Sequence, residues 1–260
     1  MSTPAAAHSG PIALVGSGEY LPQMEDVDRE LLAQVGGASA NAVVLPTASG
    51  LEQPGSPRRW AEMGVRHFTR LGTRVNAVNI LTREDAFDAR WWSLLESADL
   101  IYFSGGSPRH VVDTLVDTPA WELIRARHSA GAVLAGCSAG AMAFGRLTLQ
   151  PRALWGSNGK PRTEIWYPAL GVLPGIIALP HFDRWIARMS NATLKDLAAS
   201  LPPDVALVGV DEDTALVSLD GYATWRVMGR QTVSLIDPER GPVRYTAGAS
   251  LDLSGSVAPI

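Results

Sequence analysis

Residues 136–140 read Gly136-Cys137-Ser138-Ala139-Gly140 and place two side chains that could act as nucleophiles next to each other. A G-x-S-x-G pattern between a buried strand and a helix is typical of a nucleophile elbow, where the central residue sits on a sharp turn and small neighbours let strand and helix approach closely. The apolar run AVLAG precedes the central residues and AGAMAFG follows them. Because the glycines are centred on the serine, the pattern favours Ser138 as the nucleophile and Cys137 as a small buried residue.

A serine nucleophile needs a general base, and the base needs an acid that orients it. Among the five histidines, His181 directly follows the apolar run GIIAL and Pro180. A strand end delivers its next side chain to the carboxyl edge of a sheet, where ligands and catalytic groups of open α/β proteins gather. We therefore predict His181 as the base. His110 follows the turn SGGSPR and could line a site, but it fits the first turn of a helix equally well, and the other three histidines lie in the N-terminal segment or in helical patterns, where surface or core roles are common.

Candidate acids follow another apolar run, VALVGV, as Asp211, Glu212 and Asp213. If the strand continued through these residues, side-chain alternation would send Glu212 to one face and its two neighbours to the other. A solvated turn is the alternative reading of this acidic run. Glu164 is the only acid between Ser138 and His181 and is a second candidate for orienting the base. The residues themselves leave the acid open.

The sequence also offers two places where backbone N–H groups could stabilise an oxyanion. Ala139 follows the nucleophile, and its N–H is one donor of the elbow motif. The pair Gly105-Gly106 ends a neighbouring apolar run, and glycine lets the backbone approach a substrate closely. We expect no dinucleotide site at GSGEYL (16–21), which lacks the third glycine of that motif. We also expect no metal, because the acidic run has no nearby His or Cys.

These residues need a scaffold, and the chain alternates strand and helix patterns up to about residue 145. Apolar runs over 12–16, 41–49, 98–106 and 132–136 predict buried strands, with amphipathic helices over 24–36, 57–72 and 84–97. This alternation predicts an α/β fold with a mostly parallel sheet covered by helices on both faces. Residues 146–170 are expected to be irregular, and 183–201 to form one helix.

The C-terminal part, about 205–260, changes character. Short apolar runs separated by turns such as Asp220-Gly221 predict an antiparallel set at the edge of the sheet. With no repeat and no linker, residues 1–260 are predicted to form a single domain with a β-rich C-terminal extension.

Composition excludes several classes of protein. The 260 residues carry a formal net charge of −4 without a basic block, which argues against nucleic acid as a partner. One cysteine excludes a disulfide framework. No stretch approaches the roughly 18–20 apolar residues of a membrane span, and no secretory signal pattern opens the chain. We expect a cytoplasmic protein without a membrane partner.

Five segments occur together in the order seen in one enzyme family: VVLPTAS, YFSGGSP, AGCSAGAM, LPHFDR and GVDEDTAL. Over roughly residues 10–220 the chain resembles the cyanophycinase and dipeptidase E family of serine peptidases. That family has a fold similar to class I glutamine amidotransferases, with serine where those enzymes carry cysteine. The resemblance implies Ser138 as nucleophile, His181 as base, Glu212 as orienting acid, and oxyanion donors at Gly106 and Ala139. It also makes Ser107, Arg109 and Arg184 substrate-binding candidates.

The resulting hypothesis is a serine-type hydrolase that cleaves peptide or isopeptide bonds of small aspartyl-containing peptides, without metal or organic cofactor, and a homodimer is left open. Two alternatives stay open. Ser107-Pro108 departs from the residues usual after the glycine pair, which would suit a non-catalytic amidotransferase-like protein that binds a ligand or partner. An amidase or esterase could also use the same three side chains on non-peptide substrates.

Overall fold

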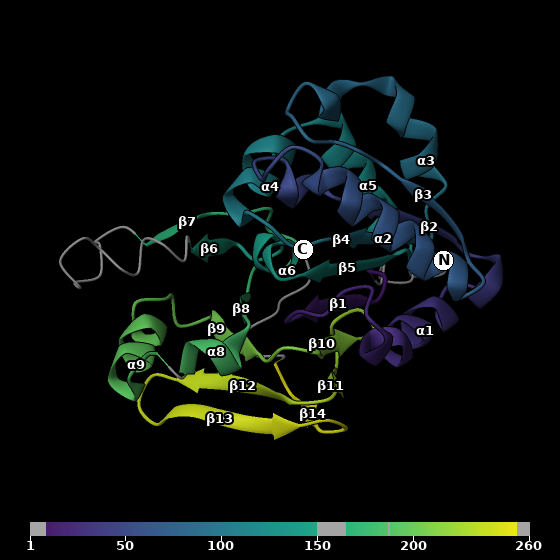
Figure 1. Cartoon of the computed structure of the whole chain (residues 1–260). Coiled ribbons are helices and arrows are strands. Elements are labelled where there is room, and N and C mark those ends of the chain that lie inside the picture. Colours follow the sequence, from purple (N-terminus) through teal and green to yellow (C-terminus); the bar gives the residue numbers. More distant parts are fainter. Residues whose placement is uncertain (1–8, 150–164, 187, 254–260) are drawn as a thin grey trace, which may run out of the picture.

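In the described residues 9–149, 165–186 and 188–253 of the computed structural model, a central sheet of eight strands has the order β14-β11-β10-β1-β5-β4-β2-β3 (Figure 1). Five neighbouring strands run parallel, namely β1 (Ile12–Val15), β2 (Asn41–Leu45), β3 (Arg74–Ala77), β4 (Leu100–Phe103) and β5 (Val133–Cys137). All except the edge strand β3 are almost fully buried, as parallel strands covered on both faces must be. The predicted mostly parallel sheet is confirmed.

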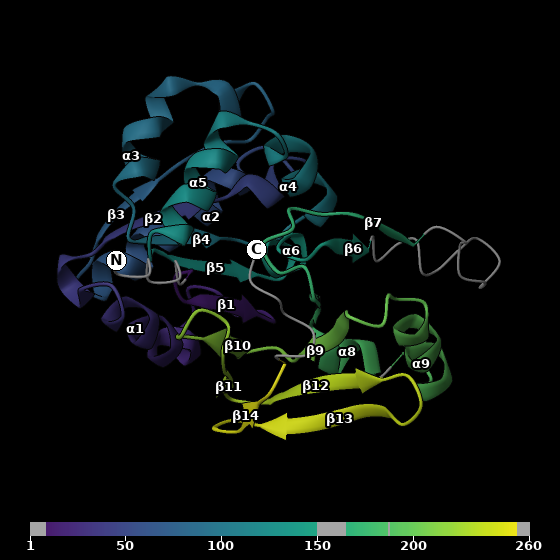
Figure 2. The same cartoon turned by 180° about the vertical axis from the view of Figure 1, so that it is seen from behind.

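Helices cover the two faces of this sheet (Figures 1 and 2). Val15 on one face packs in a cluster with residues of α1 (Glu25–Ala33) and α2 (Ser56–Arg70). Leu14, on the opposite face, belongs to a cluster with α3 (Trp92–Glu96), α4 (Pro108–Leu115) and α5 (Pro119–Ser129). Short 3-10 helices lie at 22–24, 37–39, 47–49, 85–87 and 89–91. No helix within the described ranges is long and apolar enough to cross a membrane.

Two helices that the sequence predicts as continuous are interrupted by capping side chains. In 84–97, the Asp88 carboxylate accepts the N–H of Arg90, and only Trp92–Glu96 is α-helical. In 183–201, the Ser190 hydroxyl accepts the N–H of Thr193 and starts a new helix, so the segment divides into α8 (Phe182–Ile186) and α9 (Asn191–Ala199). Asp and Ser side chains compete with the helix for backbone N–H groups, which favours them at caps.

The C-terminal strands divide between two sheets. The strands β10 (Thr214–Ser218), β11 (Trp225–Gly229) and β14 (Ser250–Leu251) extend the central sheet beyond β1, each antiparallel to the strand before it, as predicted. The others form a second sheet of order β13-β12-β9-β8, from β8 (Ile176–Pro180), β9 (Ala206–Val210), β12 (Thr232–Asp237) and β13 (Gly241–Thr246). The edge set is therefore not one sheet, because the turn after Val210 carries the chain from one sheet to the other.

The expected irregular region 146–170 contains a pair of strands, β6 (Leu147–Leu149) and β7 (Trp166–Pro168). Between them, residues 150–164 lie outside the described ranges. The parallel pair β8–β9 ends close to the carboxyl end of β5, and this closeness assembles the site described next. That the whole chain forms one domain stays a prediction.

Candidate active site

Ser138 occupies the sharp turn between β5 and α6 (Ala139–Ala143) with φ 50° and ψ −111°. This conformation is costly for a residue with a side chain, and such strain gathers at functional sites. The N–H of Ser138 donates to the carbonyl of Val15 at 2.9 Å and anchors the turn on β1. A Cβ on Gly136 would lie 2.6 Å from the backbone of Gly140, so the turn needs the glycine that the elbow pattern predicts.

His181 follows β8 and also has a positive φ, 53°. Its Nε2 lies 3.0 Å from the Oγ of Ser138. Its Nδ1 lies 2.9 Å from Oε1 of Glu212. The structure therefore brings together the three side chains that the sequence predicts as nucleophile, base and acid, although they are far apart in the chain and come from two different sheets.

Glu212 lies in the turn between β9 and β10 and is held from several sides. Its Oε2 accepts hydrogen bonds from Arg184, at 2.8 Å from Nη2 and 3.1 Å from Nε. Its own N–H donates to the carboxylate of Asp183 at 3.0 Å. The hydrogen bond with His181 and the contact with Arg184 lower the pKa of Glu212, so the carboxylate is ionised near neutral pH.

The two neighbouring acids face other elements. β9 ends at Val210, so the expected alternation along a continuing strand is wrong, and a turn sets the three directions instead. Asp211 accepts from the N–H of Thr232 at 3.1 Å, and Asp213 accepts from the side-chain amide of Gln23 at 3.2 Å. Glu164, the alternative acid, lies outside the described residues.

Ser138 and His181 open onto a pocket of about 480 Å³. Gly106, Ala139 and Ser107 also line it, which places both predicted oxyanion donors and one predicted substrate-binding residue at the pocket. Ala139 is the first residue of α6, where N–H groups have no partner within the helix. The rest of the described lining is mostly apolar, with one carboxylate: Ala48, Leu51, Glu52, Pro108, Met142, Pro180 and Trp185.

The two arginines predicted to bind substrate are not among the described lining residues of this pocket. Arg109 pairs with Asp113, with 2.7 Å between Nε and Oδ2, and its guanidinium lies 5.2 Å from the ring centre of Tyr167. Arg184 is bound to Glu212. Each arginine is thus paired with an acid: Arg109 with Asp113 of α4, and Arg184 with Glu212 of the proposed triad.

Cys137 is fully buried, as predicted, and points away from the pocket into the core. Burial, followed by the proximity of Glu19, raises the pKa of its thiol well above the usual value. The thiol donates to the Glu19 carboxylate at 2.9 Å. Sequence reasoning missed Glu19, because GSGEYL was considered only as a dinucleotide motif. Glu19 lies four positions after the last residue of β1, in the loop that follows this strand, and nothing in the local sequence marks it for a role at the site.

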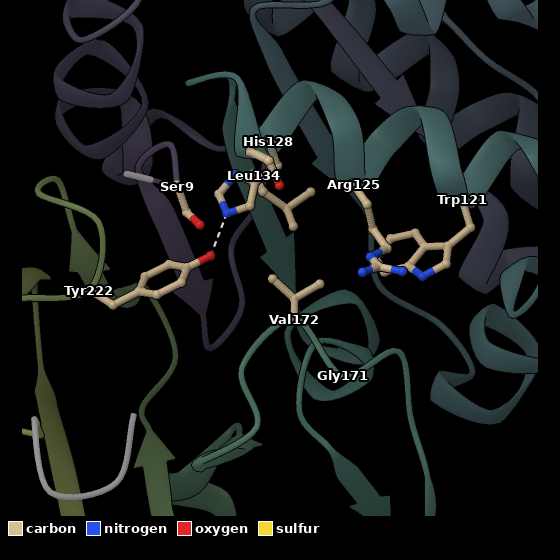
Figure 3. Close-up of a pocket in the computed structure, with 9 residues that line it drawn as sticks. Ser9, Trp121, Arg125, His128, Leu134, Gly171, Val172 and Tyr222 are labelled. Carbon is tan, nitrogen blue, oxygen red and sulfur yellow. Dashed lines mark hydrogen bonds between the residues drawn. The ribbon is translucent and has the colours of Figure 1, made fainter. Parts of the chain in front are cut away.

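A second cavity, of about 130 Å³, lies at the opposite end of β5 (Figure 3). His128 and Tyr222 lie together on one side of it and share a hydrogen bond, and the other ring nitrogen of His128 lies 2.8 Å from the carbonyl of Ala132. Both ring nitrogens are therefore engaged, and burial lowers the pKa of His128. Among the described residues that line this cavity, the histidine is bound to a tyrosine and to a backbone carbonyl rather than to a serine and an acid, so the pocket at Ser138 is the candidate active site.

No group of three or more His, Cys, Asp and Glu side chains suited to a metal ion occurs among the described residues.

Comparisons with known proteins identify the family of this chain. The model of peptidase family S51 matches residues 12–225. A peptidase from an acI-B1 Actinobacterium, known from its crystal structure, is 33% identical in sequence to this chain. The match covers 95% of this chain and 98% of the other, and the two structures superpose with a TM-score of 0.81. A protein of Listeria monocytogenes EGD-e, named as a candidate peptidase E, is 18% identical over 92% of this chain and 100% of its own, with a TM-score of 0.57, and shows a related fold. Among curated proteins, none matches. The family match over most of the chain and the closely superposing peptidase show that this protein belongs to peptidase family S51 and is a serine-type peptidase.

Proposed function

We propose that the protein hydrolyses peptide or isopeptide bonds of small aspartyl-containing peptides with Ser138 as nucleophile, His181 as general base and Glu212 as the acid that orients it. The observation that carries this proposal is the pair of hydrogen bonds that joins the three side chains, 3.0 Å from Ser138 to His181 and 2.9 Å from His181 to Glu212. Both lie within the range that proton transfer requires.

In the first step the Oγ of Ser138 forms a bond to the substrate carbonyl carbon while Nε2 of His181 takes the hydroxyl proton. The carbonyl oxygen becomes an oxyanion, which the N–H groups of Gly106 and Ala139 would stabilise. The proton on Nε2 then passes to the leaving nitrogen as the C–N bond breaks and an acyl-serine remains. Water then attacks the acyl carbon while His181 takes its proton; the bond between that carbon and Oγ of Ser138 breaks, the acid product leaves, and the proton on His181 returns to Oγ.

Glu212 supports this cycle through the other ring nitrogen. Its Oε1 accepts the Nδ1–H of His181, which leaves Nε2 unprotonated and able to take the serine proton. When the imidazole becomes charged, the ionised carboxylate stabilises it. Arg184 holds Oε2 of the same carboxylate and thereby its orientation.

The preference for aspartyl substrates rests on the resemblance to the cyanophycinase and dipeptidase E family. The described lining of the pocket supplies apolar side chains and the carboxylate of Glu52. Arg109 and Arg184 are paired with the acids Asp113 and Glu212. A panel of dipeptides with acidic, neutral and basic first residues, together with β-aspartyl dipeptides and matched esters, tests the preference. Faster cleavage of neutral or basic dipeptides would contradict the aspartyl part and leave the triad standing.

The triad itself is tested with a fluorophosphonate probe, which bonds to activated serines. The wild-type protein should be labelled, Ser138→Ala should not, and the neighbouring variant Cys137→Ala should keep the label. Loss of a triad member lowers hydrolysis by several orders of magnitude, about 10⁴–10⁶-fold in a comparable triad. Labelling that persists in Ser138→Ala, or that disappears in a folded Cys137→Ala, would contradict the assignment.

A further inference from the structure

The carboxylate of Glu19 is buried, with 6% of the residue exposed, and joins the two turns that line the active site. Its Oε1 accepts the N–H of Gly105 at 2.9 Å, in the turn after β4. Its Oε2 accepts the thiol of Cys137 at 2.9 Å, at the end of β5 and next to Ser138. A single side chain on the segment after β1 thus spans the glycine pair and the nucleophile turn.

The two turns that Glu19 joins also touch each other. A Cβ placed on Gly105 would lie 3.3 Å from Cβ and 3.8 Å from Oγ of Ser138, and 3.1 Å from Oε1 of Glu19. Gly105 is therefore packed directly between the carboxylate and the serine. Because Gly106 follows immediately, a displacement of Gly105 would move the Gly106 N–H relative to the serine oxygen.

The local backbone holds Glu19 in this position. Gly18 and Tyr20, on either side of it, have φ of 83° and 66°. The Tyr20 ring is buried and packs against Phe68 and Tyr102, with ring centres 6.3 and 5.3 Å away. A positive φ is costly for Tyr20, although not for Gly18, so the buried surroundings of Tyr20 must enforce it. Burying a carboxylate is costly unless hydrogen bonds compensate, and the bonds of Glu19 to Gly105 and Cys137 do so here.

We propose that Glu19 is a positioning residue for catalysis, which sets the distance between Ser138 and the Gly106 N–H by binding both turns at once. The inference rests on the proposed roles of Ser138 and Gly106. Glu19 does not touch the substrate: its two oxygens face Gly105 and Cys137. Its removal should therefore lower kcat and leave KM nearly unchanged, because a misplaced oxyanion donor weakens the transition state more than substrate binding.

Three substitutions separate geometry from charge. In Glu19→Gln, the amide oxygen can still accept from Gly105 and the amide NH2 can face the Cys137 sulfur, a weak acceptor. Glu19→Asp keeps the charge but is one methylene shorter and cannot reach both turns. Glu19→Met keeps the length and removes both acceptors. We expect kcat to fall about 10–10²-fold in Glu19→Asp and Glu19→Met, approaching the effect of losing one oxyanion donor, and less than about tenfold in Glu19→Gln.

Asp28 provides the matched control. It is a second buried carboxylate in the same layer of the protein, and among the described residues its side chain is hydrogen-bonded to Nε2 of His67, at 2.7 Å, rather than to either turn. Asp28→Asn should lower thermal stability while kcat, measured well below its Tm, stays near that of the wild type. An equal loss of kcat in folded Asp28→Asn would show that Glu19 acts through general stability and would overturn the proposal.

The experiment measures kcat and KM on the best dipeptide of the panel and the rate of fluorophosphonate labelling, with circular dichroism as the check of folding. If Glu19→Met does not fold, the comparison of Glu19→Asp with Glu19→Gln decides. An Asp variant as fast as the Gln variant, or Met at the wild-type rate, overturns the positioning role. Failure of the proposed function gives a different result: with Glu19 in place, Ser138→Ala would be labelled as well as the wild-type protein.

Discussion

The substitution Glu212→Gln should trap His181 in an inactive tautomer, and Arg184 is the reason. Arg184 directs two N–H groups at Oε2 of Glu212, and a guanidinium has no acceptor. In the Gln variant the amide oxygen must therefore face Arg184, and the amide NH2 must face Nδ1 of His181. Nδ1 then accepts, so the ring proton moves to Nε2, where it points at Ser138. A ring protonated at Nε2 cannot take the serine proton.

The expected loss can be worked out in two steps. A hydrogen bond to a charged group is worth about 1.5–3 kcal/mol and a neutral one about 0.5–1.5, so the exchange costs about 1–1.5 kcal/mol, or roughly tenfold at about 1.4 kcal/mol per factor of ten. The wrong tautomer adds to this, and a buried triad with an Asn in place of Asp loses about 10⁴-fold in kcat. The side chain of Glu212 is 25% exposed, so water offsets part of the effect. We expect a loss of about 10³-fold in Glu212→Gln.

A second substitution tests the tautomer argument directly. In the double variant Glu212→Gln/Arg184→Met the amide can turn, present its oxygen to Nδ1–H and restore the active tautomer. Its kcat should exceed that of Glu212→Gln by about tenfold or more, whereas Arg184→Met alone should lower kcat only a few-fold, by roughly the effect of an exposed ion pair. Both are measured by steady-state hydrolysis of the best dipeptide. A double variant no faster than Glu212→Gln would refute this reasoning, even if the single variant were inactive.

Three further outcomes follow from the structure. Burial lowers the pKa of His128, so the unfolded chain binds a proton before the folded protein does as the pH falls below about 6.5. The free energy of unfolding should therefore decrease below that pH, and it should decrease less in His128→Gln. Urea melts at about pH 8 and pH 5 measure both slopes. A slope unchanged in the variant would be inconsistent with a buried neutral imidazole. Gly140→Ala would place a Cβ 2.8 Å from the backbone oxygen of Phe103 and should destabilise the protein by about 1–3 kcal/mol, seen as a lower denaturation midpoint. Asp211→Asn weakens the hydrogen bond to Thr232 and should lower Tm with kcat nearly intact; a loss of kcat as large as that of Glu212→Gln would show that the wrong acid has been assigned.

Local pattern was sufficient for the elements that a short window determines. The apolar runs that become β1, β2, β4 and β5 are uninterrupted because helices cover both faces of the sheet, and so they are recognisable without knowing their partners. The same holds in part for the nucleophile turn. A Cβ on Gly136 would meet Gly140, only four positions further on, so this part of the pattern reports a local contact; a Cβ on Gly140 would instead meet Phe103 on β4, a contact that only the folded sheet creates.

Helix ends were predicted less well, because a single side chain can decide them. The periodicity of 183–201 is continuous, yet the Ser190 hydroxyl divides it into α8 and α9. Periodicity reports which face is buried and carries little information on whether one backbone N–H is taken by a side chain.

The candidate site itself depends on contacts between residues far apart in the chain. Nothing in DED (211–213) distinguishes Glu212 from its neighbours, and resemblance rather than residue chemistry selected it; in the structure a turn, not strand alternation, points it at His181. Glu19 has no local signal for its role either, since Gly105 and Cys137 meet it only when β1, β4 and β5 come together. Residue type and spacing thus determined which groups could react, and the packing of two sheets decided which of them meet, because hydrogen bonds between distant segments exist only once the intervening chain has folded.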